Sequence, residues 1–143
     1  MPILDPAPGR RSTRLEQAVM RRVDALHPFD LLHAQFVSHR FAPHAHETYA
    51  IGLCREGRVA VRHGGARHVM GPGDILLVNP GELHTGEPDG PVGWTYTMIY
   101  PGVEILRGVA NALRQRSGSA PILPAPMIRD PLFVTRAAAM LRN

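Results

Sequence analysis

The chain has 143 residues, of which 44% are hydrophobic, so it is long enough for one domain with a buried core and does not have a disordered composition. Its formal charge is +4 and no basic block is present, which excludes a nucleic-acid-binding arm. A single cysteine, Cys54, excludes an intrachain disulfide. No segment has the roughly 18 apolar residues that span a bilayer, and no signal-peptide run opens the chain. We therefore expect a cytoplasmic protein.

The first part of the chain has a helical pattern. Thr13 and Glu16 have the spacing of a capping box, and the apolar residues that follow recur at helical intervals. The sequence predicts a short N-terminal helix from about Thr13 to Leu26, ending before Pro28.

From residue 29 to residue 101 the pattern changes to short alternating runs separated by turns. Fourteen glycines and fourteen prolines favour many short strands. Gly64-Gly65 has the signature of a hairpin turn. The sequence predicts a mainly β fold, an antiparallel barrel or jelly roll. The predicted strands cover residues 32–41, 48–55, 58–62, 67–70, 75–78, 84–87 and 93–100.

Helical periodicity returns near the C-terminus. An apolar stripe predicts a helix over residues 103–113 that ends by Ser117-Gly118, and a proline-containing connector over 119–129. Asp130-Pro131 then predicts the start of a second helix over 132–141. This helix has no stop signal, so we expect further protein to follow it.

Three histidines form the strongest candidate site. His44 and His46 lie two positions apart, and in an extended segment such side chains face the same way. The turn before His84 delivers a third imidazole. Three convergent histidines can bind a divalent metal such as zinc. They are equally suited to hydrogen-bonding a polar small molecule, water or turn backbone.

Aromatic residues supply candidates for ligand binding. Trp94, Tyr96 and Met98 share one face of the last strand and could form the apolar wall of an effector pocket, although core packing explains the same pattern. Tyr49 is a further candidate for effector contact, with packing in the sheet as the alternative. A redox role for Cys54 would need a lowered pKa, for which the sequence offers no cause. No nucleophile elbow, phosphate loop or dinucleotide fingerprint is present, so no catalytic residue is assigned.

Two segments carry a family resemblance. Residues 40–53, which contain Pro43-His44-Ala45-His46, and residues 71–84, which end in Pro80-Gly81-Glu82-Leu83-His84, resemble the two motifs of the cupin family. In this order and followed by helices, they resemble more narrowly the N-terminal effector-binding and dimerisation domain of AraC-type transcription regulators. The resemblance covers about residues 29 to 141.

The resemblance implies an organisation and a function. Residues 1–28 would form an arm with a short helix, 29–101 the cupin-like barrel, and 102–143 a helical dimerisation region. It implies a small-molecule effector, a homodimer, and DNA binding only through helix-turn-helix motifs in a C-terminal domain absent from this sequence, with no membrane partner.

One departure from the cupin pattern bears on catalysis. Metal-binding cupins usually carry a glutamate four to five positions beyond the second histidine, and Ala50 and Ile51 stand there instead. We therefore expect a sensing domain and not an enzyme. The alternatives are a small metal-dependent cupin enzyme, such as a dioxygenase or isomerase, and a stand-alone sugar- or metal-binding module.

Overall fold

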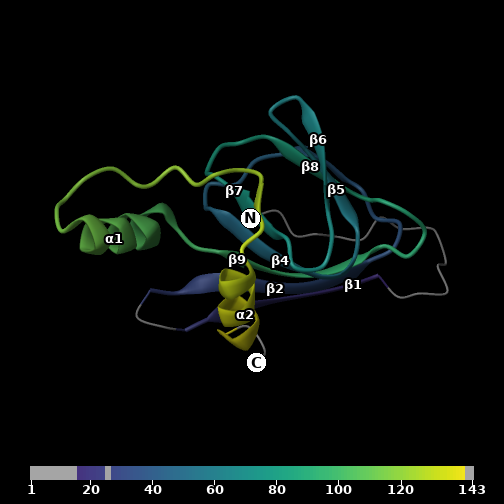
Figure 1. The fold of residues 1–143 in the computed structure, drawn as a ribbon, viewed down its shortest axis with the longest axis horizontal. Helices are drawn as coiled ribbons and strands as arrows, with labels where there is room; N and C mark the ends of the chain where they lie inside the picture. The colour runs from purple at the N-terminus through teal and green to yellow at the C-terminus, as the bar shows by residue number, and fades with distance from the viewer. Residues whose placement is uncertain (1–15, 25–26, 141–143) are drawn as a thin grey trace.

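The computed structural model describes residues 16–24 and 27–140, which form two antiparallel β-sheets and two helices (Figure 1). The six-stranded sheet has the order β1-β2-β9-β4-β7-β10, and the four-stranded sheet the order β3-β8-β5-β6. Strands distant in sequence are neighbours in both sheets, as in the jelly roll that the strand pattern predicts. The bounds are β1 Gln17–Val23, β2 Phe29–Phe36, β3 Phe41–His44, β4 Ala50–Gly57, β5 Val59–His63, β6 Ala66–Met70, β7 Ile75–Val78, β8 His84–Pro88 and β9 Trp94–Tyr100.

The predicted N-terminal helix is wrong in the part that the structure describes, where Gln17–Val23 form strand β1. This strand pairs along its whole length with β2. Glu16 does not close a capping box, because its Oε1 atom accepts hydrogen bonds from the backbone N–H groups of residues 37–39. The hydrogen bonds of the β1–β2 ladder and of the Glu16 carboxylate stabilise the strand more than helix propensity stabilises a helix here. Helix propensities of ordinary residues differ by only about 0.7 kcal/mol per residue. The rest of the predicted helix lies outside the described residues.

The apolar core lies between the two sheets. Its buried members come from both of them: Leu32, Ala34, Phe36, Ala50, Val59, Val61, Met70, Val78, Trp94, Met98 and Tyr100. The rings of Phe36 and Trp94 lie 5.3 Å apart between their centroids, and both side chains are fully buried. Aromatic pairs at this separation add to the stabilisation from burial. They hold β2 against β9, so alternate side chains of β9 point between the sheets.

The hairpin between β5 and β6 has the predicted turn. Gly64 and Gly65 have φ values of 59° and 81°. A type I′ turn needs positive φ at both central residues, which glycine adopts without steric cost. The prediction of a Gly-Gly hairpin is confirmed, and the register that follows pairs His63 with Ala66.

The first helix, α1, spans Val103–Arg114 and contains no buried residue. Figure 1 shows it to the side of the barrel, away from the sheets. Its apolar side chains Val109 and Leu113 are 53% and 81% exposed. The helix ends at Arg114, one residue beyond the predicted range, and Gln115 follows it in a left-handed conformation with φ 57°. α1 is therefore an amphipathic helix whose apolar side chains Val109 and Leu113 are left exposed.

Residues 119–129, called the connector below, return from α1 to the barrel, and Met127–Ile128 form β10 on the edge strand β7. Asp130 Oδ1 then accepts hydrogen bonds from the N–H groups of Leu132 and Phe133, which confirms the predicted helix start.

Helix α2 spans Pro131–Met140 and covers part of the six-stranded sheet. Its Val134 packs with Leu53, Ile75 and Leu77 in a second apolar cluster. These residues alternate along β4 and β7 with the core residues, so α2 and the connector lie on the outer face of this sheet. In the described part of the chain, neither helix has the length and apolar character needed to cross a membrane.

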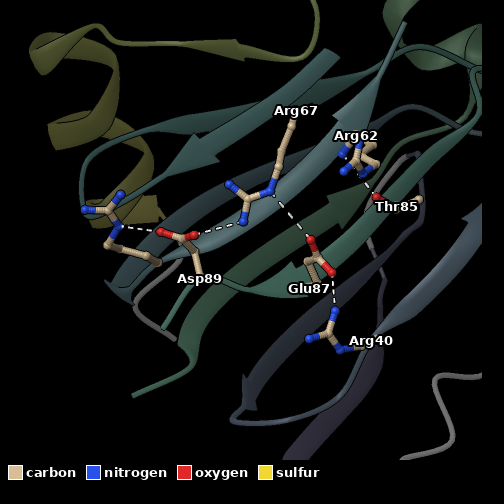
Figure 2. A network of polar contacts seen from close by, with 7 residues as sticks. Arg40, Arg62, Arg67, Thr85, Glu87 and Asp89 are labelled. Atoms are coloured by element: carbon tan, nitrogen blue, oxygen red, sulfur yellow. Dashed lines mark hydrogen bonds and ion pairs between the residues drawn. The ribbon is translucent and has the colours of Figure 1, made fainter. Parts of the chain in front are cut away.

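Ion pairs on the four-stranded sheet hold β8 in place (Figure 2). Arg67 lies between Asp89, at 2.9 Å, and Glu87, at 3.6 Å. Glu87 also pairs with Arg40, and Asp89 pairs with Arg58 at 3.0 Å. The hydrogen bond from Arg67 holds the pKa of Asp89 below its ordinary value, so this carboxylate is ionised at neutral pH. The network links β6 and the segment before β3 to β8.

Candidate metal and ligand site

The pairing of β3 with β8 brings the three predicted histidines together. His44 ends β3 and lies opposite His84, which begins β8. The ring centroids are 4.3 Å apart for His44 and His84, 4.9 Å for His44 and His46, and 5.2 Å for His46 and His84. One ring nitrogen of each lies within 4.8 Å of those of the other two. His46 follows β3 and does not belong to it, yet its side chain lines the same cavity.

Two of the imidazoles are oriented by backbone carbonyl groups. The Nδ1 atom of His44 lies 2.8 Å from the carbonyl oxygen of Ala42, and that of His84 lies 3.0 Å from the carbonyl oxygen of Glu82. A carbonyl oxygen only accepts, so each Nδ1 must carry the proton. In the neutral form of such a ring the lone pair lies on Nε2. Metal-binding histidines are typically oriented by such a bond.

His46 differs from the other two histidines in its hydrogen bonding. Its Nδ1 atom is buried and has no hydrogen-bond partner in the described part of the chain. Burial is the largest of the effects that lower the pKa of His46 to about 4, because the charged ring would lose solvation. Repulsion between a charged His46 and a charged His44 or His84 contributes to this lowering of the pKa. Burial also lowers the pKa of His84. Both rings are therefore neutral at pH 7, the form that binds a metal.

The histidine cluster contains no carboxylate among the residues that the structure describes. Glu47 is exposed, and Ala50-Ile51 supply no donor. Asp74 lines the cavity, but its Oδ1 accepts a hydrogen bond from Arg129 Nε at 2.7 Å and its Oδ2 accepts one from Gly71 N–H at 2.9 Å. Three imidazoles with an open position fit zinc better than an iron site that needs a carboxylate.

The cluster opens into a cavity of about 50 Å³ between the sheets. Because one water needs about 10–15 Å³ by such a measure, the cavity holds a few waters or a compact ligand. Besides the histidines and several aliphatic residues, its wall contains four aromatic and three sulfur-containing side chains. These side chains are Phe41, Cys54, Met70, Trp94, Tyr96, Met98 and Tyr100.

Three of the four residues predicted to contact the effector line the cavity, and the fourth does not. Trp94, Tyr96 and Met98 line the cavity, on the β9 face that the alternation indicates. Tyr49 does not line it: the side chain is buried and its hydroxyl donates a hydrogen bond to the carbonyl oxygen of Pro121 in the connector at 2.6 Å. Tyr49 therefore contacts the connector and not the cavity.

Cys54 is a wall residue with no sign of activation. Burial, followed by the nearby Asp74 carboxylate, raises the pKa of its thiol to about 11. A thiol with this pKa is protonated at neutral pH and is a poor nucleophile. The structure therefore adds no support to a redox role.

Comparison with protein families decides the classification. Residues 26–142 match the model of the AraC-like ligand binding domain. The chain belongs to the AraC-like ligand-binding domain family. Its cupin fold is that of this domain. The comparison with curated proteins gave no match.

Solved structures similar to this AraC-like domain are cupin barrels. A cupin 2 conserved barrel protein from Salinispora arenicola is 19% identical, with a TM-score of 0.53 over 68% of this chain and 84% of that chain. A cupin superfamily protein from Desulfitobacterium hafniense is 14% identical, with a TM-score of 0.53 over 71% and 94%. A protein of unknown function from Rhizobium leguminosarum is 20% identical, with a TM-score of 0.51 over 60% and 82%. At these identities the likeness shows the fold alone.

Sequence reasoning missed several residues of the AraC-like site. Tyr100 lines the cavity and continues the alternation of Trp94, Tyr96 and Met98, so the spacing alone could have identified it. Glu82 orients His84 through its backbone carbonyl, which no pattern of side chains reveals.

Proposed function

We propose that this domain senses a small effector in the cavity between its sheets. The observation that carries the proposal is a cluster of three imidazoles that opens into a largely apolar cavity, in a domain of the AraC-like ligand-binding family. Such cavities with few convergent polar groups are typical small-molecule sites. The effector would shift the domain between two states by binding one of them more tightly.

His44, His46 and His84 are the residues that would hold a divalent metal such as zinc. When bound, the metal supplies a Lewis-acidic position for an oxygen or nitrogen atom of the effector. The protein orients two rings through the carbonyl groups of Ala42 and Glu82. With no carboxylate in the cluster, a site of this kind keeps the full charge of the cation and favours an anionic donor group.

The wall of the cavity sets the remaining chemistry of the effector. Trp94, Tyr96 and Met98 face the ligand with aromatic and thioether surface, which favours an apolar part beside the polar group. Met98 is unbranched and flexible, so it can adjust to ligands of different shape. We therefore expect a compact molecule with a polar or anionic end and an apolar end.

Binding is favoured over catalysis by the state of the titratable groups in the cavity. The carboxylate of Asp74 is occupied by Arg129 and Gly71, and the thiol of Cys54 is protonated. Burial raises the pKa of Tyr96 and of Tyr100, so neither phenol ionises at neutral pH. A small metal-dependent cupin enzyme stays the second candidate because three imidazoles leave an open coordination position. It would lack a free carboxylate to serve as general base.

Dimerisation through α1 completes the proposal. The exposed Val109 and Leu113 lie on an amphipathic helix without buried residues, and α1 of a second copy would cover this stripe. DNA binding would reside in a domain outside this chain. We place the homodimer in the cytoplasm, as expected for a regulator.

The single tryptophan provides the test of the sensing proposal. Trp94 is the only tryptophan of the chain and lines the cavity, so its fluorescence reports binding there. Zinc-loaded protein would be titrated with sugars, amino acids and aromatic acids, while mass spectrometry follows each compound. The proposal predicts a saturable fluorescence change with one class, lost in His84→Ala and kept in His27→Ala, which alters an exposed histidine. Conversion of the bound compound into a product would support the enzyme instead.

A further inference from the structure

The turn formed by residues 79–82 connects β7 to β8 and contacts two of the three histidines. The carbonyl oxygen of Glu82 accepts the Nδ1–H of His84 at 3.0 Å. The N–H of Gly81 donates to the carbonyl oxygen of His46 at 2.8 Å. The position of this turn and the positions of His46 and His84 therefore depend on each other.

Hydrogen bonds within the turn make it a single unit. Glu82 Oε1 accepts the backbone N–H of Asn79 at 2.7 Å, and the N–H of Glu82 donates to the carbonyl oxygen of Asn79 at 3.2 Å. The second carboxylate oxygen, Oε2, lies 3.1 Å from Nε2 of His63 on β5. A displacement at Glu82 is thus passed directly to Asn79.

The side chain of Asn79 holds the connector. Its Nδ2 donates to the carbonyl oxygen of Leu123 at 3.0 Å, and its Oδ1 accepts the N–H of Leu123 at 2.7 Å. Asn79 is only 9% exposed. Releasing the connector would leave buried polar groups without partners, which is costly. Docking of the connector therefore depends on where the turn places Asn79.

We propose that Asn79 couples metal binding at the histidine cluster to docking of the connector. The inference rests on the metal site proposed above. A metal that fixes His46 and His84 fixes the 79–82 turn, and the turn presents the Asn79 amide to Leu123. By linkage, a docked connector must strengthen metal binding by the same factor.

A second tether of the connector supplies a matched control. The hydroxyl of Tyr49 donates to the carbonyl oxygen of Pro121, two residues before Leu123, and Tyr49 makes no recorded hydrogen bond to the described residues of the turn. Tyr49→Phe removes this hydrogen bond with little change in volume. It loosens the connector without disturbing the route from Asn79 to the histidines.

The experiment measures, in the same proteins, the affinity for zinc and the rate of hydrogen exchange at a backbone amide of the connector. Calorimetric zinc titration would compare the wild type with Asn79→Ala, Asn79→Asp and Tyr49→Phe. NMR-detected hydrogen exchange would follow the Leu123 amide with and without zinc. We expect zinc binding about five- to tenfold weaker in Asn79→Ala, and exchange at Leu123 slowed by a similar factor when zinc binds the wild type. Tyr49→Phe should bind zinc as the wild type does.

The outcomes separate this proposal from the one on which it rests. Wild type that binds zinc with no change at Leu123, or variants of Asn79 with wild-type affinity, would overturn the coupling and leave the metal site standing. An equal loss of zinc affinity in Tyr49→Phe would also overturn the coupling, because a general loosening of the connector would then explain the effect of the Asn79 variants. Wild type that binds no zinc would reject the metal site itself. Asn79→Asp keeps the acceptor for the Leu123 N–H, so it serves if Asn79→Ala does not fold.

Discussion

The Sδ atom of Met98 lies directly above Gly52, where a Cβ atom would stand 1.8 Å from it. The two residues are paired across β4 and β9, and both line the cavity. The absence of a side chain at position 52 therefore gives Met98 its place in the wall. Glycine is required here by close approach of a neighbour and not by its backbone angles.

Gly52→Ala tests the role of this contact in the site. The new methyl group must displace Met98, and overpacking of this kind typically costs about 1–3 kcal/mol of stability. We expect a lower free energy of unfolding in urea and a weaker fluorescence response of Trp94 to ligand. Gly102→Ala is the matched control, because a Cβ there meets no atom within 4 Å. Wild-type stability and ligand response in Gly52→Ala would contradict the arrangement.

The acid stability of the protein should depend on Arg129. Burial raises the pKa of Asp74, but the hydrogen bonds from Arg129 and Gly71 outweigh it, so the pKa lies below its ordinary value. Because the pKa of Asp74 is lower in the folded chain than in the unfolded chain, where it is about 3.9, the ionised carboxylate stabilises the fold at a pH above about 3.9. This stabilisation is lost as the pH falls through the pKa of the folded state. Arg129→Ala should be less stable than the wild type at pH 7.

Thermal unfolding between pH 2.5 and pH 7 measures this effect. The difference in melting temperature between the wild type and Arg129→Ala should shrink below about pH 4, as Asp74 becomes protonated in both proteins. Arg62→Ala, which alters an exposed side chain without an ion pair in the described structure, should show no such dependence. A difference that stayed constant across this range would refute the role assigned to the Asp74–Arg129 pair.

Dimer formation should depend on the exposed face of α1. Leu113 is 81% exposed in the single chain, and a charge at its position would be buried in the proposed helix interface at high cost. We expect Leu113→Glu to elute as a monomer in size-exclusion chromatography with light scattering, while the wild type is a dimer. Val92→Glu changes another exposed apolar residue and should leave the dimer intact. Monomeric wild type would reject the interface.

The sequence predicts the barrel well because its signals are local. Period-two alternation and glycine turns mark β5, β6, β7 and β9 with small errors at their ends. Asp130 beside Pro131 identifies the start of α2 because capping is decided within a few residues. The gathering of the three histidines follows from motifs that place His44 and His84 at strand ends and His46 two residues beyond His44.

The failures of prediction all concern long-range contacts. The helical spacing before Val23 gives way to a strand because β2 supplies a ladder partner and residues 37–39 supply donors for Glu16. Tyr49 contacts a connector carbonyl more than seventy positions away, which no pattern around Tyr49 encodes. The role of Asn79 is hidden for the same reason, since it holds the backbone of Leu123.

The central claim is that His44, His46 and His84 form one metal site inside a sensing cavity. Zinc titration of protein purified without a histidine tag, followed by calorimetry and elemental analysis, tests it most directly. We predict one zinc per chain in the wild type and in His27→Ala. His84→Ala should bind at least about 100-fold more weakly, because loss of a ligand exceeds the roughly 10–100-fold effect of losing an outer partner. Wild type without zinc, or His84→Ala with unchanged zinc affinity, would contradict the account.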